Sequence, residues 1–477
     1  MRREASISTL AAALLAALGI APLASQAATI IVTTSSDSAT DPGCTLRNAI
    51  VSMNTGTTVG NCANTGALFG TNDTINFDTA VAAFPNGGAN TILLGNGQLS
   101  ITAYHLTIDA SANGNVTIDA QQNSRVMYDN AAYGSSLTLN HLTLRNGTAS
   151  NDCLGNSIGG GICIPNASLA LTDSTLSNNS ASYGGGGIFS ITGGITLTDS
   201  ALVNNTTAGK GGGVFSTFHT GSVTLTNSTL SGNSALSGGG IYSGASAVTL
   251  TNSTLSGNSA TNGKGGGIYS AAGTATLTNS TLSANSAPNG KGGGIFSGGT
   301  LMLTGSTLNG NSAANGDGGA IYSSGTGNAT VINSTLSGNS AANGGGIYAY
   351  HPGYLTLTHA TISANTATSF GGGGVRGNAS ITVNNSIVAG NTQAGGPDLY
   401  PGFGAGANNL MGGDPLLGAL GDNGGPTQTM ALETASAAFH LAAACVSTDQ
   451  RGLARPANHC DAGAFEDTVF FNGFEGY

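Results

Sequence analysis

Residues 238–260 read Gly-Gly-Gly-Ile-Tyr-Ser-Gly-Ala-Ser-Ala-Val-Thr-Leu-Thr-Asn-Ser-Thr-Leu-Ser-Gly-Asn-Ser-Ala, and close variants of this stretch recur along the chain. We align ten copies on an Asn, at positions 146, 179, 205, 233, 258, 285, 311, 339, 365 and 391. After a first step of 33 residues, the remaining steps are 25–28 residues long. A repeat of this length predicts a solenoid, in which each unit rests on the one before it.

Each repeat contains three short extended stretches and no helical pattern. The stretch 248–251, Val-Thr-Leu-Thr, alternates apolar and polar residues that favour a pleated surface. Gly runs and Asn-Ser pairs supply corners, because Gly and Asn tolerate positive φ. These features predict an all-β, right-handed, single-stranded parallel β-helix of about ten or more coils, with equivalent strands about 4.8 Å apart. The Leu pattern of a leucine-rich repeat is absent.

The chain divides into five predicted parts. Residues 1–27 begin with Met1-Arg-Arg, continue with an Ala/Leu-rich run and end in Ser-Gln-Ala, which predicts a secretory signal peptide. Residues 28–103 form an N-terminal cap, in which a short helix at 44–50 covers the first coil. We expect the coils over 104–396, an irregular C-terminal cap over 397–466, rich in Gly, Pro and Asp, and a tail over 467–477.

Six cysteines in an exported chain suit disulfides. Proximity in sequence favours Cys44 with Cys62, Cys153 with Cys163, and Cys445 with Cys460, although six cysteines allow 15 pairings. The first and last pairs would staple the two ends, and the middle pair would close an insertion in the long first step. Zinc-ligand spacing is absent.

The charge of the chain narrows the choice of partners. The formal net charge is −10, and loss of Arg2, Arg3 and Glu4 with the signal peptide makes it −11. This acidity argues against nucleic acid and anionic lipid as partners. After the signal peptide, no apolar run is long enough to span a bilayer. We therefore expect an extracellular or surface protein without a membrane-spanning segment.

Stacking turns residues of equal phase into spatial neighbours, and one such column is aromatic. Its members follow the glycine run in seven successive repeats: Phe189, Phe215, Tyr242, Tyr269, Phe296, Tyr322 and Tyr348. Rings repeated at strand spacing can stabilise the stack. Because alternation with an inward Ile or Val turns them outward, they can also offer a sugar-binding platform. Both interpretations remain open at the level of sequence.

Two further columns contain charged residues. Asp173 and Asp199 share a corner position in adjacent repeats, where paired carboxylates are a weak candidate for a metal site. Asp, Asn, Gly and His interchange at this position, which is typical of a structural corner, and no metal or other cofactor is expected. Lys210, Lys264, Lys291 and Asp317 precede their glycine runs and predict a solvated turn.

Several motifs resemble one group of bacterial exported proteins. Gly-Gly-Gly-Ile-Tyr alternating with Leu-Ser-Gly-Asn resembles the polymorphic outer membrane protein repeat, with Leu in place of its Phe. Residues 44–50, Cys-Thr-Leu-Arg-Asn-Ala-Ile, resemble the N-terminal domain named after Cys-Ser-Leu-Arg-Glu-Ala, with Asn48 replacing Glu. Residues 421–427, 448–452, 455–456 and 460–466 are similar to the choice-of-anchor type Q region, and 469–475 resemble terminal motifs of Gram-negative surface proteins. The resemblance implies export and surface display.

Two functions are weighed against each other. Between residues 146 and 400 there are five Asp and no Glu, and only Asp173 and Asp199 fall together. We therefore expect a non-enzymatic, adhesin-like or interaction scaffold that binds glycans or surface proteins. The alternative is a secreted lyase or hydrolase of acidic polysaccharides, which requires a carboxylate cluster with a base on one face.

Overall fold

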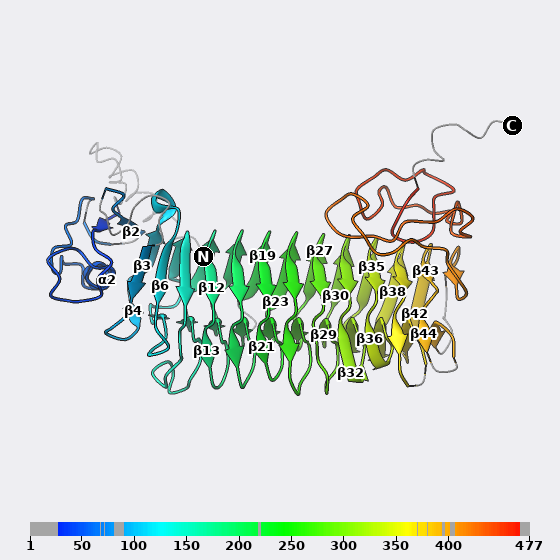
Figure 1. The fold of residues 1–477 in the computed structure, drawn as a ribbon, viewed down its shortest axis with the longest axis horizontal. Helices are drawn as coiled ribbons and strands as arrows, with labels where there is room; N and C mark the ends of the chain where they lie inside the picture. The colour runs from blue at the N-terminus through cyan, green and yellow to red at the C-terminus, as the bar shows by residue number, and fades with distance from the viewer. Residues whose placement is uncertain are drawn as a thin grey trace, which may run out of the picture.

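The computed structural model describes residues 27–467 except 67, 71, 81–89, 218–220, 370, 379, 394–395 and 401–405. Apart from residues 27 and 467, the predicted signal peptide and tail lie outside these residues. The described chain forms an elongated rod of parallel β-coils, which confirms the predicted fold class (Figure 1). Successive coils run along the rod from the blue N-terminal end to the yellow and orange C-terminal end.

Three long parallel sheets run along the rod, and each complete coil contributes one strand to each sheet. Sheet A contains, in spatial order, β1 (Thr29–Val32), β2 (Asp73–Phe77), β5 (His105–Asp109), β8 (Ser136–Asn140), β11 (Ser168–Thr172), β15 (Ile195–Thr198), β19 (Ser222–Thr226), β23 (Ala247–Thr251), β27 (Ala275–Thr278), β30 (Leu301–Thr304), β34 (Ala329–Ile332), β38 (Tyr354–Thr358) and β42 (Ser380–Asn384).

Sheet B follows sheet A in each coil. It contains β3 (Asn90–Leu93), β6 (Val116–Asp119), β9 (Leu142–Arg145), β12 (Thr175–Ser177), β16 (Ala201–Val203), β20 (Thr229–Ser231), β24 (Thr254–Ser256), β28 (Thr281–Ser283), β31 (Thr307–Asn309), β35 (Thr335–Ser337), β39 (Thr361–Ser363), β43 (Ile387–Val388) and β46 (Leu410–Met411).

Sheet C completes each coil. It contains β4 (Leu99–Ile101), β7 (Met127–Asp129), β10 (Ile162–Ile164), β14 (Ile188–Ser190), β18 (Val214–Ser216), β22 (Ile241–Ser243), β26 (Ile268–Ser270), β29 (Ile295–Ser297), β33 (Ile321–Gly325), β37 (Ile347–Pro352), β41 (Val375–Gly377) and β45 (Leu399–Tyr400).

Short strands at the Ser-Ala pairs add a fourth side that the three-strand prediction lacks. They form two small parallel sheets: β13 (Ser180–Ala181), β17 (Thr206–Thr207), β21 (Ser234–Ala235) and β25 (Ser259–Ala260), then β32 (Ser312–Asp317), β36 (Ser340–Asn343), β40 (Thr366–Ala367) and β44 (Thr392–Gln393).

The core follows from the register. In sheet A, Leu250 pairs with Leu225 on one side and Leu277 on the other, and all three are fully buried. Thr249 and Thr251, on either side of Leu250, are half-buried on the outer face. The period-2 alternation therefore sorts Leu inward and Thr outward in every coil, as a strand requires.

A buried column of asparagines lies at the corner after sheet B. From Asn179 to Asn365, each side-chain Nδ2 donates to the Oδ1 of the next Asn over 2.8–3.0 Å. The same Nδ2 donates to a backbone carbonyl of the preceding coil, as Asn285 does to Leu255 O over 2.9 Å. We call this the inner Asn ladder. It satisfies polar groups that the coil buries at this corner.

One step of the sequence alignment is wrong. Asn146 has a positive φ of 56° and lies at the register position of Asn178, outside the inner Asn ladder. Gly147 occupies the ladder position, and its N–H donates to Asn179 Oδ1 over 2.8 Å. The first step is thus 32 residues. The alignment erred because two amide residues, Asn178 and Asn179, are adjacent in the next coil.

The glycine runs let neighbouring coils approach closely. A Cβ on Gly266 would lie 2.3 Å from Gly293 O of the next coil, and Gly265, directly before it, has a φ of +69°. Only glycine fits this position without strain.

The N-terminal cap contains α2 (Leu46–Thr55), the short helix predicted from residues 44–50. Thr45 is its N-cap, and its side chain accepts from the backbone N–H of Asn48. Leu46, Ala49, Ile50 and Met53 are buried in the main core. The apolar face of α2 therefore covers the N-terminal end of the coils.

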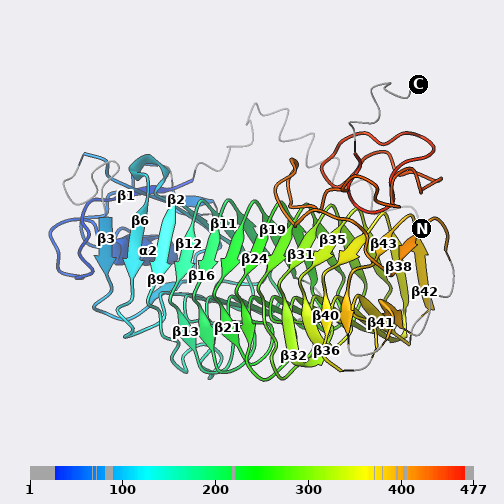
Figure 2. The same cartoon turned by 45° about the vertical axis from the view of Figure 1, so that its right-hand side comes forward.

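The predicted C-terminal cap divides into two parts. Strands β45 and β46 complete a last coil. Residues 414–467, which we call the C-terminal region, instead lie along the flank of the rod over its last coils (Figures 1 and 2). Thr427 Oγ1 donates to Gly305 O over 2.8 Å, and Ala464 N donates to Thr361 Oγ1 over 2.9 Å. The region thus packs sideways on sheet B and its corner with sheet A, whereas an end cap was predicted.

The three predicted disulfides are present, joining Cys44 to Cys62, Cys153 to Cys163 and Cys445 to Cys460. Among the described residues, no helix combines the length and apolar character needed to cross a bilayer.

Candidate functional site

The aromatic column lies on the outer face of sheet C. Ile241 points into the core and Tyr242 points away from it, because alternate residues of a strand face opposite sides. The register then places the predicted rings in neighbouring strands, in the order Phe189, Phe215, Tyr242, Tyr269, Phe296, Tyr322 and Tyr348. The structure therefore brings the seven predicted residues together in one row.

The rings pack against each other along this row. From Tyr242 to Tyr348, successive rings are stacked, with centroids 4.5–5.4 Å apart and planes 5–13° from parallel. Phe189, Phe215 and Tyr242 meet edge to face. Five of the rings are only 4–8% exposed. This geometry differs from the predicted platform, because neighbouring rings occupy the faces on which a sugar would stack; glycan binding at these residues stays a prediction.

The predicted lysine column covers the aromatic column. Lys210 Nζ lies 5.0 Å from the centroid of Tyr242, Lys264 Nζ lies 4.4 Å from that of Phe296, and Lys291 Nζ lies 4.5 Å from that of Tyr322. Each lysine therefore reaches the ring of the next coil in a cation–π contact. The two columns, treated separately in the sequence, form one flank of the rod.

Lys291 is held more tightly than the other lysines. Its Nζ lies 3.1 Å from Asp317 Oδ2 and 3.0 Å from Tyr322 Oη. Burial lowers the pKa of Lys291, but the hydrogen bonds to Tyr322 and Asp317 outweigh it and raise the pKa above its ordinary value. Burial also raises the pKa of Tyr242, Tyr269 and Tyr348. Lys291 is therefore a charged donor at neutral pH.

A polar cavity of about 300 Å³ opens beside these lysines and spans three successive coils. Its lining is Asn262, Gly263, Lys264, Asn289, Gly290, Lys291, Asn315, Gly316 and Asp317. Asn289 Nδ2 donates to Asn262 Oδ1 and Asn315 Nδ2 donates to Asn289 Oδ1, each over 3.0 Å. We call this exposed row the outer Asn ladder. It repeats at the surface the arrangement that the inner Asn ladder has in the core.

Sequence reasoning missed Asn262, Asn289 and Asn315, although a signal was present. The sequence Asn-Gly-Lys-Gly at 262–265 and 289–292, followed by Asn-Gly-Asp-Gly at 315–318, occurs in three adjacent coils. The neighbouring coils lack it, with Ala-Leu-Ser-Gly at 235–238 before it and Ala-Ala-Asn-Gly at 341–344 after it. The coils are otherwise uniform, so this local departure marks one place along the rod.

The carboxylates Asp173 and Asp199 lie on a different corner, between sheets A and B. Both have positive φ, 47° and 50°, as do His141, Asn227 and other members of their column. His141 Nε2 lies 3.6 Å from Asp173 Oδ2. Within the described part of the chain, no three His, Cys, Asp or Glu side chains converge as metal ligands would. The positive φ values account for the Asp, Asn, Gly and His found at this corner.

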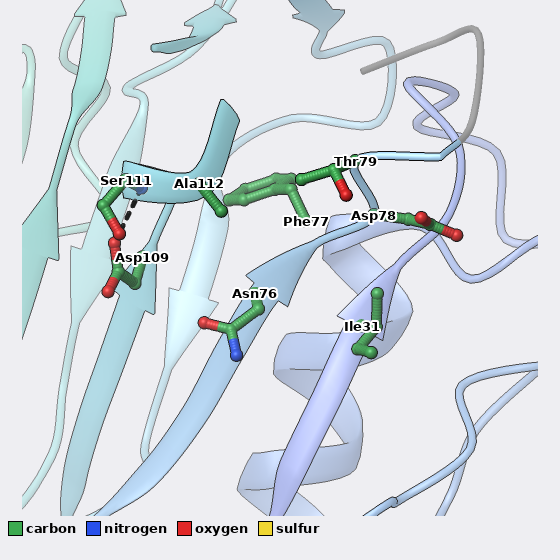
Figure 3. Close-up of a pocket in the computed structure, with 8 residues that line it drawn as sticks. All are labelled: Ile31, Asn76, Phe77, Asp78, Thr79, Asp109, Ser111 and Ala112. Carbon is green, nitrogen blue, oxygen red and sulfur yellow. Dashed lines mark hydrogen bonds between the residues drawn. The ribbon is translucent and has the colours of Figure 1, made fainter. Parts of the chain in front are cut away.

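A second cavity, of about 450 Å³, lies near the N-terminal end of sheet A (Figure 3). Ile31, Asn76 and Asp109 come from neighbouring strands of sheet A, and Phe77, Thr79 and Ala112 line the cavity above them. Asp109 Oδ1 already accepts from Ser111 N over 2.8 Å. The two carboxylates that line the cavity, Asp78 and Asp109, each accept a hydrogen bond from the backbone N–H two residues further on, as in a local turn.

Comparisons with known proteins agree with the coil geometry. The family described as the right handed beta helix region matches residues 241–413. The family described as the Chlamydia polymorphic membrane protein repeat matches residues 173–191. None of the curated proteins matches the chain. The N-terminal and anchor-like resemblances are matched by neither family. Together the two matches indicate a β-helix protein that carries a repeat similar to that of the Chlamydia polymorphic membrane proteins.

Proposed function

We propose that this protein is an exported, non-enzymatic scaffold of the bacterial surface, which adheres to glycans or to other surface proteins. Export and adhesion go beyond the family matches. The observation that carries the proposal is the in-register repetition of identical polar side chains along the outer face of the rod.

Sheet A supplies one such face. Its register aligns Thr196, Thr224, Thr249 and Thr276 in one column. A second column, of Thr198, Thr226, Thr251 and Thr278, runs parallel to it. Each Thr hydroxyl can both donate and accept a hydrogen bond. A ligand that itself repeats, such as a glycan chain, can therefore bind several equivalent positions at once and gain avidity.

Shortening the rod tests this interpretation. Thr206 pairs with Ser234, so removal of residues 206–233 joins Asn205 to Ser234 and keeps every later residue in register. We expect the shortened protein to fold. It should bind immobilised glycans or isolated bacterial surfaces with lower avidity than the full chain. Equal avidity in both would contradict adhesion by repetition.

Two further measurements test export and the absence of catalysis. Fractionation of the native cells should place the protein at the surface or in the medium, and recovery in the cytosol would overturn export. Incubation with uronate polymers, with and without Ca²⁺, should leave their chain length unchanged. Shortened polymers would favour a lyase or hydrolase instead.

A further inference from the structure

The flank that contains the outer Asn ladder is the positively charged part of an acidic protein. Residues 200–390 contain four cations, Lys210, Lys264, Lys291 and Arg376, and one carboxylate, Asp317, which gives a net charge of +3. The whole chain has a net charge of −10. All four cations lie over rings of the aromatic column. Their charges are therefore concentrated on one side of the rod.

Lys264 is the cation in the cavity that is available to a ligand. Lys291 is engaged by Asp317 and Tyr322. Lys264 is exposed, and within the described residues it forms no ion pair. Its contact with Phe296 fixes the direction of the side chain, while an ammonium group keeps three donors. An oriented, unpaired ammonium favours an anionic partner.

The outer Asn ladder beside Lys264 has unused hydrogen-bonding capacity. An amide offers two donors and one acceptor oxygen with two lone pairs. Asn262 uses only its oxygen, Asn315 uses one donor, and Asn289 uses one donor and its oxygen once. Amides in a row about 4.8 Å apart are well suited to the successive hydroxyl groups of a saccharide.

The floor of the cavity is backbone. A Cβ on Gly290 would lie 1.5 Å from Gly263 O, so the coils stack here without side chains between them. The Asn and Lys side chains therefore stand at the rim, where a flat ligand can lie across three coils.

We propose that this cavity binds a carboxylate-bearing saccharide, with the carboxylate on Lys264 and the hydroxyl groups on Asn262, Asn289 and Asn315. The inference rests on the proposed function and names the class of glycan that the scaffold takes. The net negative charge of the chain does not prevent this binding, because charges beyond about 8 Å are screened at physiological ionic strength.

Binding of two matched probes tests the charge. A galacturonate tetrasaccharide carries free carboxylates, and its methyl-esterified form has the same skeleton without the charge. We expect calorimetric titration to detect the free acid, to show weaker binding of the ester, and to show loss of affinity as salt is raised. Equal binding of both forms would overturn the proposal.

Two lysine variants locate the site. Lys264→Gln should weaken binding of the free acid about fivefold, as for loss of one exposed charge contact. Lys210→Gln is the matched control, because Lys210 also covers a ring but lies outside the cavity. It should leave the affinity unchanged. An unchanged affinity in Lys264→Gln, or an equal loss in both variants, would contradict the assigned site.

The outer Asn ladder is tested separately. Asn289→Ala should weaken both the free acid and the ester, because it removes hydroxyl contacts and no charge. Thermal unfolding of each variant checks that the coils remain folded. If the protein adheres to surfaces but binds neither tetrasaccharide, this inference fails while the proposed function stands. If it neither adheres nor binds, both fail.

Discussion

The coils and the C-terminal region are stabilised by different kinds of polar contact. In the coils, buried Asn side chains repeat the same neutral hydrogen bonds from Asn179 to Asn365. The C-terminal region instead contains buried ion pairs, between Arg455 and Glu466 at 2.6 Å and between Arg451 and Asp449 at 2.8 Å. Both side chains of the first pair are at most 1% exposed.

This difference predicts that single substitutions affect the stability of the two regions differently. A solenoid distributes its stability over many equivalent neighbour contacts. The C-terminal region depends on a few contacts that occur once, such as Gln450 among Thr307, Thr335 and Thr427. Gln450 and Ala464 therefore help to hold this region against the rod. Single substitutions should release the region and leave the coils folded.

The largest expected effect is at Arg455. Its guanidinium donates to Glu466 Oε2, Asp461 O and Gly463 O. Arg455→Met leaves Glu466 buried without its partner, which costs about 3–5 kcal/mol. We expect limited proteolysis to cleave residues 414–467 rapidly while the circular dichroism of the coils persists. Arg455→Met combined with Glu466→Leu should recover part of the loss, and no recovery would contradict a role for the pair.

Acid should loosen the same region through His359. The side chain is fully buried at the A/B corner, with Nε2 3.4 Å from Ala444 O. Burial, then the charge of Arg455, lowers the pKa of His359 to about 4. Because the unfolded pKa is near 6.5, stability is complete above that pH and falls by about 3 kcal/mol as pH drops towards 4.

Thermal unfolding at several pH values measures this loss. His359→Asn is the control, since Asn333 and Asn385 occupy the same corner in the neighbouring coils. An unaltered pH dependence in the variant would exclude His359 as its source.

In the N-terminal coils, stability should fall as the pH rises, which is opposite to the effect of His359. Asp129 is 1% exposed, and its burial raises the pKa to about 6, although Ala131 N donates to it over 2.8 Å. The unfolded carboxyl ionises near 3.9, so stability falls by about 3 kcal/mol as pH rises from 4 to 6 and then stays constant. In Asp129→Asn this loss should vanish, as followed by hydrogen exchange of residues 99–145. A variant that still loses protection over this pH range would exclude Asp129.

A smaller loss of stability is expected for a substitution in the inner Asn ladder, and a still smaller one in the outer Asn ladder. Asn285 Oδ1 accepts from Asn258, and Asn285 Nδ2 donates to Leu255 O and Asn311. Asn285→Ala leaves buried groups unsatisfied and should cost about 2 kcal/mol. Asn289→Ala, four residues on but exposed, should cost below about 0.5 kcal/mol. Denaturant unfolding of both variants gives the comparison, and equal costs would contradict it.

A further small effect is expected at Tyr322. Tyr322→Phe keeps the ring stack and removes the hydroxyl that contacts Lys291. We expect a loss of about 0.5–1 kcal/mol and a lower pKa for Lys291, measured by NMR titration of its side chain. Tyr322→Ala removes the ring contacts as well as the hydroxyl, so it is the contrasting variant and should show a clearly larger loss of stability. Similar losses in both would show that the hydroxyl, and not the stack, matters.

The repeated part of the molecule was predictable and the unique part was not. Spacing predicted the coils, the inward Leu positions and the disulfide between Cys445 and Cys460, because each depends on neighbours in sequence or in phase. Gln450 contacts Thr307 from 143 residues away and belongs to no repeat, so no pattern indicated docking on the flank. The aromatic column was predicted, but the contacts that Lys264 and Lys291 make with the rings of the next coil were not, because spacing alone does not show how far a side chain reaches.

The inner Asn ladder has a direction. Every amide turns its oxygen towards the N-terminal neighbour and its NH₂ towards the C-terminal neighbour, so the group dipoles add along the rod. At the positive end stands Asp398, whose Oδ1 accepts from Asn391 N over 2.7 Å where another amide would otherwise follow. A carboxylate there compensates the summed dipole, as an acidic residue does at the start of a helix. The row of amides thus ends at a counter-charge.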